Sequence, residues 1–470
     1  MRLRTTAFVI FLLSFLAFAA LSPQDTINTQ IVTRLGLTLS MLEDGTLTID
    51  RFAERTIDKA LHEGHYYADK VPGHPFLAIP SVVVARALLP AVGLGGDTLD
   101  PDVFHRYAYV ATLGTNALFS AVAAALFFLS ALRLGGSSAG ALFATAGLVL
   151  ATPFLGWSTA FFAHSVSASL LVFLGALLIH SFWARPDRPP MAGRPVLSGA
   201  LTGLSAGLAI FVDLTTAPVT VVLCLTALVL AWRQGRDFAQ RYLPAAILGG
   251  LVALIPLLVY NQIAFSSPFK LGYSSVVGFE GMQSGFFGIT WPSPGVLMQI
   301  LFGLYRGLLP LAPILLLVPA GLLRLAGMPG GRLPAALVAA ATVIYLWINS
   351  SYFYWDGGYS TGPRHLVPLL PFLCLTLAFA WPRGVLARRL ALALLAVSGA
   401  ISLICAAVDM FAPEFFPYPF VQHLWPNFWA PEPLLRSLPV LAVWLGFAWL
   451  ARRLAADPQQ ARQVGSLRPA

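Results

Sequence analysis

Long apolar runs constrain this chain more than any other feature of its sequence. A helix needs about 20 mainly apolar residues to cross the hydrocarbon core of a bilayer, and runs of that length recur along almost the whole chain. The predicted spans are 4–22, 107–132, 137–155, 163–183, 197–213, 216–232, 242–262, 298–323, 333–349, 364–382, 390–408 and 437–451. The predicted fold class is therefore an all-α polytopic membrane protein with about twelve transmembrane helices.

The composition excludes several other classes. Hydrophobic residues make up 57% of the 470 residues and charged residues only 10%, whereas a soluble globular protein carries about 25% charge. A soluble domain, a disordered chain and a free-standing nucleic-acid binder are therefore excluded. Cys224, Cys374 and Cys405 all fall inside apolar runs, so they are expected to be small core residues and not a disulfide set or metal site.

A thirteenth apolar run, 76–93, is not predicted to cross the membrane. It contains Arg86 and is punctuated by prolines. If it does not cross and the N-terminus is cytoplasmic, the arginine clusters at 185–194, 233–241 and 383–389 all face the cytoplasm, as the positive-inside rule requires. If it crosses, these loops turn outward. We therefore predict that 76–93 is an interfacial or re-entrant helix on the outer surface.

These assignments divide the chain into six parts. They are a first transmembrane helix or signal anchor (1–22), an extracytoplasmic subdomain with interfacial helices (23–106), a transmembrane module (107–262), an outer loop (263–297), C-terminal transmembrane helices (298–453) and a cytoplasmic tail (454–470). A cleavable signal peptide is the alternative for the first part, because two arginines precede its apolar run and Ala-Phe-Ala follows.

The first outer loop carries most of the polar chemistry. It holds eleven of the twenty acidic residues, and its length far exceeds that of a simple connector. Apolar residues at helical spacing predict a helix over 26–42, and 52–63 is predicted to form a second short helix. Asp25 precedes the first helix, where it is either an N-cap or a functional carboxylate at the mouth of the first span.

The same loop contains a compact polar segment. Residues 64–75 combine two tyrosines, an acid, a lysine, two histidines and two prolines. Because prolines and glycine fix the backbone, the segment is typical of a rigid binding loop. A solvated cap without chemistry is the alternative for the whole loop, and a lipid-headgroup contact is the alternative for its lysine. The candidate binding residues here are His65, Tyr66, Tyr67, Asp69 and Lys70.

Further candidates lie at the outer ends of later spans. His164 opens one span, and the loop 352–365 brings Asp356 and Tyr359 together with Arg364. Aromatic residues at an interface often form only the aromatic belt, and a lone histidine is often a polar cap. The glycines, acid and arginine of this loop favour a binding role.

Three short motifs resemble a known superfamily. An acid, Asp25, follows the first span directly; the segment 66–72 reads YYADKVP; and the segment 362–368 reads GPRHLVP at the start of a late span. Together these resemble the GT-C-type membrane glycosyltransferases that use polyprenyl-phosphate sugars, such as protein O-mannosyltransferases and lipid A aminoarabinose transferases. Thr26 and Val71 depart from the usual glutamate and proline of those motifs.

The resemblance implies an enzyme of the bacterial inner membrane. It would transfer a hexosyl or pentosyl group from a polyprenyl-phosphate donor to a hydroxyl of a lipid, glycan or protein on the extracytoplasmic face, with inversion. Asp25 is implied as the general base, and Lys70 and Arg364 as the ligands of the donor phosphate. The residues implied as supporting are His65, Tyr66, Tyr67, Asp69, His164, Asp356 and Tyr359. No nucleotide or nucleic acid is needed; a divalent metal is left open.

Three other functions compete with this interpretation. A transporter usually carries ionisable residues near the bilayer midplane and shows repeated halves, whereas the spans predicted here are nearly free of charge at their centres. A polymerase or ligase of lipid-linked glycans would be expected to carry its large outer loop later in the chain. A non-catalytic assembly factor is a third alternative.

The predicted topology can be tested by cysteine labelling. Thr48→Cys and Asp100→Cys lie before and after the run 76–93. Both are expected to react with a membrane-impermeant maleimide added from outside, because both belong to the predicted outer loop. Labelling of only one of the two positions would show that 76–93 crosses the bilayer.

Overall fold

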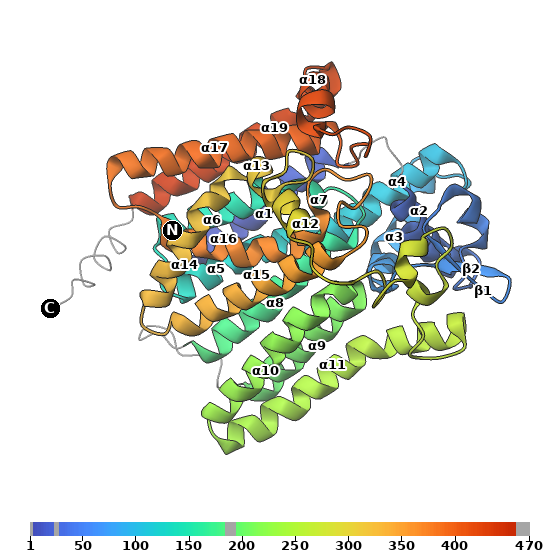
Figure 1. Ribbon diagram of the computed structural model, residues 1–470, viewed down its shortest axis with the longest axis horizontal. Helices are drawn as coiled ribbons and strands as arrows, with labels where there is room; N and C mark the ends of the chain where they lie inside the picture. The colour runs from blue at the N-terminus through green and yellow to red at the C-terminus, as the bar shows by residue number, and fades with distance from the viewer. Residues whose placement is uncertain (1–2, 23–27, 184–193, 457–470) are drawn as a thin grey trace.

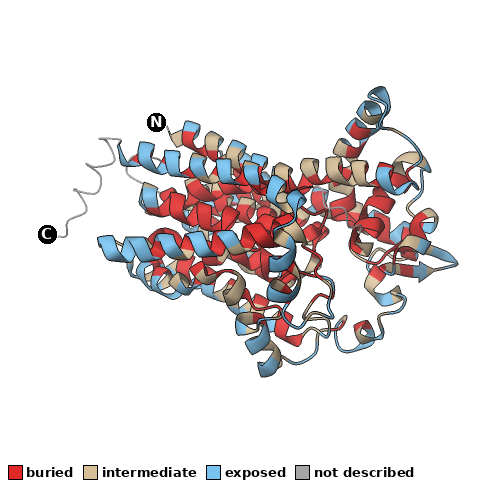
Figure 2. Cartoon of the chain, turned by 90° about the horizontal axis from the view of Figure 1, so that it is seen from above, coloured by how far each residue is buried: buried red, intermediate tan, exposed pale blue. Residues whose placement is uncertain are grey.

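The computed structural model describes residues 3–22, 28–183 and 194–456. Its long helices run side by side in one bundle, and a smaller subdomain containing α2, β1, β2 and α3 lies at one end of that bundle (Figure 1). Buried residues concentrate inside the bundle, and exposed residues cover the outer helices (Figure 2). The subdomain is the part of the chain predicted to be the first outer loop.

The first half of the chain forms eleven α-helices among the described residues. They are α1 (Leu3–Leu21), α2 (Thr29–Glu43), α3 (Gly73–Ala91), α4 (Pro101–Thr112), α5 (Leu118–Arg133), α6 (Ser138–Leu150), α7 (Phe154–Trp157), α8 (Ala163–Phe182), α9 (Pro195–Val212), α10 (Ala217–Arg233) and α11 (Arg236–Phe265). The strands are β1 (Lys59–His62) and β2 (His65–Ala68).

The second half is also helical. Its α-helices are α12 (Pro294–Phe302), α13 (Leu308–Leu311), α14 (Val318–Gly327), α15 (Arg332–Ser351), α16 (Leu370–Ala380), α17 (Val385–Val408), α18 (Trp425–Phe428) and α19 (Pro431–Ala455). Short 3-10 turns that matter below are η1 (Asp50–Arg55), η4 (Leu214–Thr216), η5 (Gly272–Ser275), η7 (Pro313–Leu317) and η8 (Arg364–Leu369).

The polytopic all-helical fold class is confirmed. Among the described residues, ten helices are long and apolar enough to cross a membrane, judged by length and composition. Three predicted spans are instead built from shorter apolar helices: 137–155, 298–323 and 364–382. The prediction of one continuous span over 298–323 was wrong, because α12 ends at Phe302 and glycines and prolines interrupt the helix before α14.

The subdomain departs from its predicted all-helical form. Residues 52–63 do not form a helix: η1 ends at Arg55 and an antiparallel hairpin of β1 and β2 follows. The hairpin turn consists of Glu63 and Gly64, both with positive φ (51° and 84°). Positive φ at both central residues is the geometry of the tight turn that matches strand twist. The glutamate-glycine pair was therefore the sequence signal for a hairpin turn, and it was missed.

The helix α2 begins later than predicted. It starts at Thr29, and its N-cap is Asn28, whose side chain accepts a hydrogen bond from the backbone N–H of Gln30 at 2.9 Å. The predicted N-cap role of Asp25 is therefore wrong, because an asparagine closer to the helix supplies the acceptor. Asp25 itself lies outside the described residues.

The run predicted to lie at the interface forms the helix α3. It packs against α2 and α4 within the subdomain (Figure 1), while Val83, Val84 and Leu88 expose apolar surface on its other side. Length and composition also place α3 among the ten helices that could span a membrane. Its interfacial placement therefore stays a prediction.

Loops that the arginine pattern assigns to one membrane face lie together at one end of the bundle. The backbone N–H of Thr290 donates to the carbonyl of Ser351 at 2.9 Å, and that of Thr361 donates to the carbonyl of Met410 at 2.9 Å. Val276 forms an isolated bridge with Ala60 at the edge of the hairpin. The loops after α11, α15 and α17 thus close over the end of the bundle that carries the subdomain.

The tightest helix pair in the bundle is α9 with α11. Gly203 of α9 lies so close to α11 that an added Cβ would stand 1.7 Å from the carbonyl oxygen of Ala246. Gly199 and Gly207 make similar approaches one turn away on either side. Small residues at every fourth position let two helix backbones meet inside a membrane, where dispersion contacts drive association.

We predict that Gly203→Val separates this pair. The added side chain collides with the α11 backbone, and overpacking of this kind costs about 3 kcal/mol of unfolding free energy. Gly175→Val on α8 is the matched control, because an added Cβ there meets nothing within 4 Å. Thermal unfolding in detergent, followed by tryptophan fluorescence, should show a marked fall in Tm for the first variant only. Equal shifts for both variants would contradict the packing argument.

Candidate functional site

An ion pair stands where the β-hairpin runs into α3. The ammonium of Lys70 bonds to Oδ2 of Asp69, whose side chain is fully buried, and lies 5.3 Å from the ring centre of Tyr273. Burial opposes the charge of Lys70, but the Asp69 carboxylate and Tyr273 outweigh it and raise the pKa of Lys70. Lys70 is therefore a permanent cation at this position.

The backbone around this pair is tightly covered. An added Cβ on Gly272, at the start of η5, would lie 3.0 Å from the carbonyl oxygens of both Ala68 and Asp69. The loop after α11 therefore packs directly against the backbone segment that carries the ion pair. This cover keeps water from Asp69 and brings Tyr273 above Lys70.

A second cation, Arg34, lies in the middle of α2. It is only 5% exposed, and Nη2 donates to Oε1 of Gln30 at 3.3 Å. Its Nε and Nη1 are buried without a hydrogen-bond partner among the described residues. Burial lowers the pKa of Arg34, and the charge of Asp69 opposes that shift. Buried guanidinium donors almost always have acceptors, so these free donors indicate a place for an anion.

The carboxylate of Asp58 faces the same region. It is 5% exposed and accepts hydrogen bonds from the hydroxyl of Thr29 and from Nε2 of Gln30, the latter at 2.6 Å. Because these two residues form the first turn of α2, Asp58 fixes the start of that helix. The negative charge of Asp58 also acts on the buried cations around it.

A third cation, Arg364, comes from the opposite end of the sequence. It is 7% exposed, its Cζ lies 5.7 Å from the ring centre of Phe162, and its Nε lacks a hydrogen-bond partner among the described residues. Gly357 permits this position: its φ is +74°, and an added Cβ would stand 2.7 Å from Nε of Arg364. The glycine-rich loop therefore shapes the space for the guanidinium.

Arg34, Lys70 and Arg364 form what we call the cation cluster. The charge of Asp58 acts on all three, and the charges of Lys70 and Arg364 both act on the phenol of Tyr352. Such interactions weaken with distance and are screened by solvent. The three cations therefore share electrostatic partners, Asp58 for all three and Tyr352 for Lys70 and Arg364, although the first and last are separated by most of the chain.

A histidine–aspartate pair adjoins the cluster. Nδ1 of His164 lies 3.7 Å from Oδ2 of Asp213, and Oδ1 of Asp213 accepts hydrogen bonds from the N–H and hydroxyl of Thr215 at 3.0 and 2.8 Å. Burial would raise the pKa of Asp213, but His164 and Thr215 lower it to about 2. The ring of His164 also meets that of His365 at 5.6 Å. The carboxylate of Asp213 thus lies near the imidazole without a hydrogen bond to its Nδ1.

The hairpin residues predicted to support the site make their contacts elsewhere. Tyr67 packs against Phe265 with ring centres 5.4 Å apart, and the ring of Tyr66 lies under Lys59. His65 is exposed and pairs with Asp50 at 2.7 Å. Of the predicted binding loop, Lys70 belongs to the cation cluster and Asp69 is its ion-pair partner.

The remaining predicted residues lie on the loop before η8. Oδ1 of Asp356 accepts from the N–H of Gly358 at 3.1 Å, and Oδ2 lies 3.5 Å from the hydroxyl of Tyr305. Tyr359 is 48% exposed. Asp356 therefore stabilises the turn that packs against Arg364. Tyr359 faces outward.

Sequence reasoning missed Arg34 and Tyr273, and it also missed Arg306, which is fully buried and donates to the carbonyl of Gly358 at 2.7 Å on the loop before η8. Arg34 is the one charge inside the apolar run 26–42, and Arg306 is a charge inside the predicted span 298–323. A charge placed inside an apolar run was the available signal for both. Tyr273 carried no comparable signal, because its place above Lys70 depends on the loop after α11.

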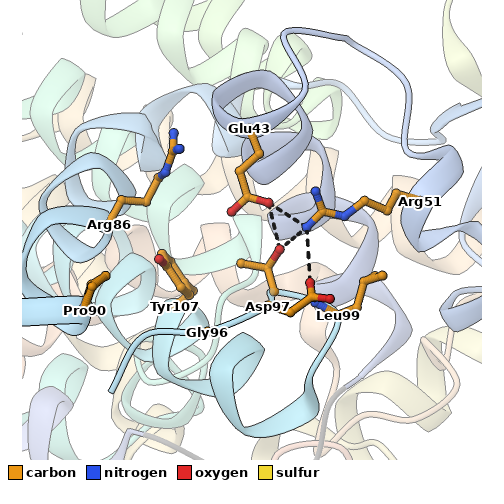
Figure 3. Close-up of a pocket in the computed structure, with 9 residues that line it drawn as sticks. Glu43, Arg51, Arg86, Pro90, Gly96, Asp97, Leu99 and Tyr107 are labelled. Atoms are coloured by element: carbon orange, nitrogen blue, oxygen red, sulfur yellow. Dashed lines mark hydrogen bonds and ion pairs between the residues drawn. The ribbon is translucent and has the colours of Figure 1, made fainter. Parts of the chain in front are cut away.

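A separate cavity of about 570 Å³ opens on another side of the subdomain (Figure 3). Arg51 lies at its wall and bonds to Glu43 at 2.6 Å, with Asp97 at 4.0 Å. Figure 3 shows Arg86 apart from this group, beside Tyr107. The paired carboxylates neutralise the charge of Arg51.

The described residues contain no group of three or more histidine, cysteine, aspartate or glutamate side chains placed to hold a metal ion. The three cysteines are all free thiols. The chemistry of the site among these residues is that of carboxylates, imidazoles and fixed cations.

Comparison with known proteins shows which known fold this chain resembles. No protein-family model and no curated protein sequence matches the chain. Among solved structures it is similar to ArnT from Cupriavidus metallidurans bound to undecaprenyl phosphate, with a TM-score of 0.53, 16% identity, and coverage of 97% of this chain and 77% of that chain. The apo state of the same protein gives 0.53, 15%, 96% and 76%.

This likeness defines the class of fold. The chain has the polytopic helical architecture of ArnT over nearly its whole length, and with its apolar helices it is an integral membrane protein. The resemblance to GT-C-type membrane glycosyltransferases inferred from three short motifs is confirmed for the fold.

The ion pair can be tested through stability. Asp69→Asn leaves Lys70, a partly buried cation, without its anion, and breaking a buried pair costs about 3 kcal/mol. The double variant Asp69→Asn/Lys70→Met removes both charges and should recover most of that loss. Asp97→Asn, at a side chain that is 70% exposed, is the control.

Unfolding by sodium dodecyl sulfate in mixed micelles measures these free energies. The double variant should be more stable than Asp69→Asn alone. If the double variant is instead the less stable of the two, Lys70 and Asp69 do not stabilise each other as a pair.

Proposed function

We propose that this protein is a glycosyltransferase that moves a hexosyl or pentosyl group from a polyprenyl-phosphate donor to a hydroxyl acceptor. The observation that carries the proposal is the cation cluster. Arg34 and Arg364 keep buried donors without acceptors among the described residues, and Lys70 stays charged through its ion pair with Asp69. A phosphate is the ligand that such a set of cations binds best.

The fold supports a lipid-borne phosphate as this ligand. The neighbouring structure of ArnT is a complex with undecaprenyl phosphate, and the present chain shares its architecture. The helix α2, which carries Arg34, and the hairpin that precedes Lys70 lie at one end of the bundle of apolar helices (Figure 1). If its polyprenyl tail lies in the hydrocarbon core, a lipid phosphate would lie at this end of the bundle.

The proposed reaction is a direct displacement. The acceptor oxygen forms a bond to the anomeric carbon, the bond from that carbon to the phosphate oxygen breaks, and polyprenyl phosphate leaves. The cation cluster stabilises the charge that develops on the leaving phosphate. One displacement inverts the anomeric centre.

Asp25 is the proposed general base that takes the hydroxyl proton. In the sequence it precedes Asn28, the cap of α2, by three residues. The first turn of α2 bonds to Asp58, whose charge acts on the whole cation cluster. The short connection to that turn supports a role for Asp25 in the same site.

The partners follow from this chemistry. We propose a polyprenyl-phosphate sugar as donor, a lipid, glycan or protein as acceptor, and a site on the extracytoplasmic face of a bacterial inner membrane. The arginine distribution supports that sidedness. A divalent metal is left outside the proposal.

Donor turnover tests the function. Purified protein in nanodiscs is given a panel of undecaprenyl-phosphate sugars, with a membrane lipid extract of the native cells as the source of acceptor, and released undecaprenyl phosphate is measured. At least one donor should be consumed. Asp25→Asn should lower its turnover by about 10²–10⁴, because it removes the proton acceptor with little change in volume.

Matched variants make the result specific. Asp102→Asn changes an exposed acid of the same loop and should leave turnover within about twofold, a difference of about 0.4 kcal/mol. Lys70→Met should weaken donor use through lost phosphate contacts. Unchanged turnover in Asp25→Asn would remove Asp25 as the base, and no consumption of any donor would count against the transferase proposal itself.

A further inference from the structure

A groove of about 640 Å³ lies beside the cation cluster, at the same end of the bundle. It runs between the end of α12, the loop after α15 and the loop after α17. Its wall includes Gln299, Tyr305, Trp355, Glu414, Phe415 and Tyr418. Nothing in the proposed donor chemistry uses this groove.

The groove combines aromatic faces with polar groups. Four of the named wall residues are aromatic, and Glu414 and Gln299 add a carboxylate and an amide. Aromatic rings pack against the apolar C–H face of a ligand ring. Amide and carboxylate oxygens accept hydrogen bonds from hydroxyls. A saccharide presents both kinds of surface, so it matches this lining.

The groove opens beside surface suited to lipid. On its α12 side, Met298, Phe302 and Leu304 are 53–64% exposed. On its other side Phe415 is 69% exposed, and α18, which carries the exposed Trp425 and is followed by the exposed Trp429, projects outward from the bundle (Figure 1). Exposed tryptophan and aliphatic side chains at the end of a helical bundle are typical of the membrane interface. The ligand can therefore remain anchored in the bilayer.

The charge of the groove differs from that of the cation cluster. The side chain of Arg306 is fully buried, and its Nη2 donates to the carbonyl of Gly358 at 2.7 Å and stands 3.3 Å from the hydroxyl of Tyr305. None of the described residues that line the groove is a lysine or arginine, and Glu414 is acidic. The lining favours a neutral or amino sugar and disfavours a phosphate.

One turn separates the groove from the cation cluster. Asp356 on that turn bonds to Tyr305 on the groove side at 3.5 Å, and Tyr305 also donates to the carbonyl of Glu414 at 3.0 Å. The next residue, Gly357, backs onto Arg364. A ligand in the groove is therefore close to the place where the donor phosphate is proposed to bind.

We propose that this groove binds the acceptor, and that the acceptor is a saccharide carried by a membrane lipid. The sugar stacks on the aromatic wall, its hydroxyls bond to Glu414 and Gln299, and its lipid lies along the exposed face of α12. This inference rests on the proposed function, since it assigns the second substrate of the same reaction.

A photoaffinity probe tests the groove directly. An alkyl β-glucoside with a diazirine next to the sugar is incorporated into nanodiscs that hold the full-length protein, and labelled peptides are mapped by mass spectrometry. Labels are expected on 298–305 and 414–418. Octyl β-glucoside should compete with the probe, whereas octyl tetraethylene glycol, which has the tail without the sugar, should not.

Variants at the exposed rim complete the test. Phe415→Ala/Tyr418→Ala removes two wall aromatics and Glu414→Gln removes the carboxylate; labelling should fall about tenfold in the first, as for loss of binding hot spots. Trp429→Ala, an exposed tryptophan outside the groove, is the matched control and should label like the parent protein.

Two outcomes would overturn the inference: labelling spread evenly over lipid-facing helices, or equal competition by both detergents. Donor consumption is measured on the same samples. If it persists while groove labelling fails, the acceptor lies elsewhere and the transferase proposal stands. If donors are never consumed, the transferase proposal fails independently.

Discussion

Burial of fixed cations is the constraint on which this site depends. Arg34, Lys70 and Arg364 lie at the end of an apolar bundle, and among the described residues only Lys70 has a direct carboxylate partner, Asp69. Taking such charges out of water is costly unless anions or hydrogen-bond acceptors surround them. Asp58 and Asp69 meet part of that need, and an anionic ligand would meet the rest.

The surrounding architecture follows from holding these charges in place. Lys70 follows the hairpin, Arg34 lies on α2, and a glycine-rich turn leaves space for Arg364. Close helix packing, as between α9 and α11, gives the rigid bundle against which the loops close. The same turn that accommodates Arg364 forms one border of the aromatic groove, so two chemically different surfaces meet at one place.

The sequence predicted the fold class for identifiable reasons, and it singled out two candidate site residues that stay predictions. Apolar length is sufficient to find most spans, and short polar motifs drew attention to Lys70 and Arg364. It failed where long-range packing decides: the hairpin after Arg55, the break after Phe302, and the place of Tyr273 over Lys70. Tyr67 shows the same limit, because local sequence does not reveal that its ring turns toward Phe265.

A structure with undecaprenyl phosphate bound tests the central claim most directly. The account predicts that the phosphate lies within hydrogen-bond distance of Lys70 and of the free guanidinium donors of Arg34 and Arg364, with the polyprenyl tail along the apolar helices. A phosphate bound away from all three cations, or three cations that stay without a ligand while the lipid occupies another site, would contradict it.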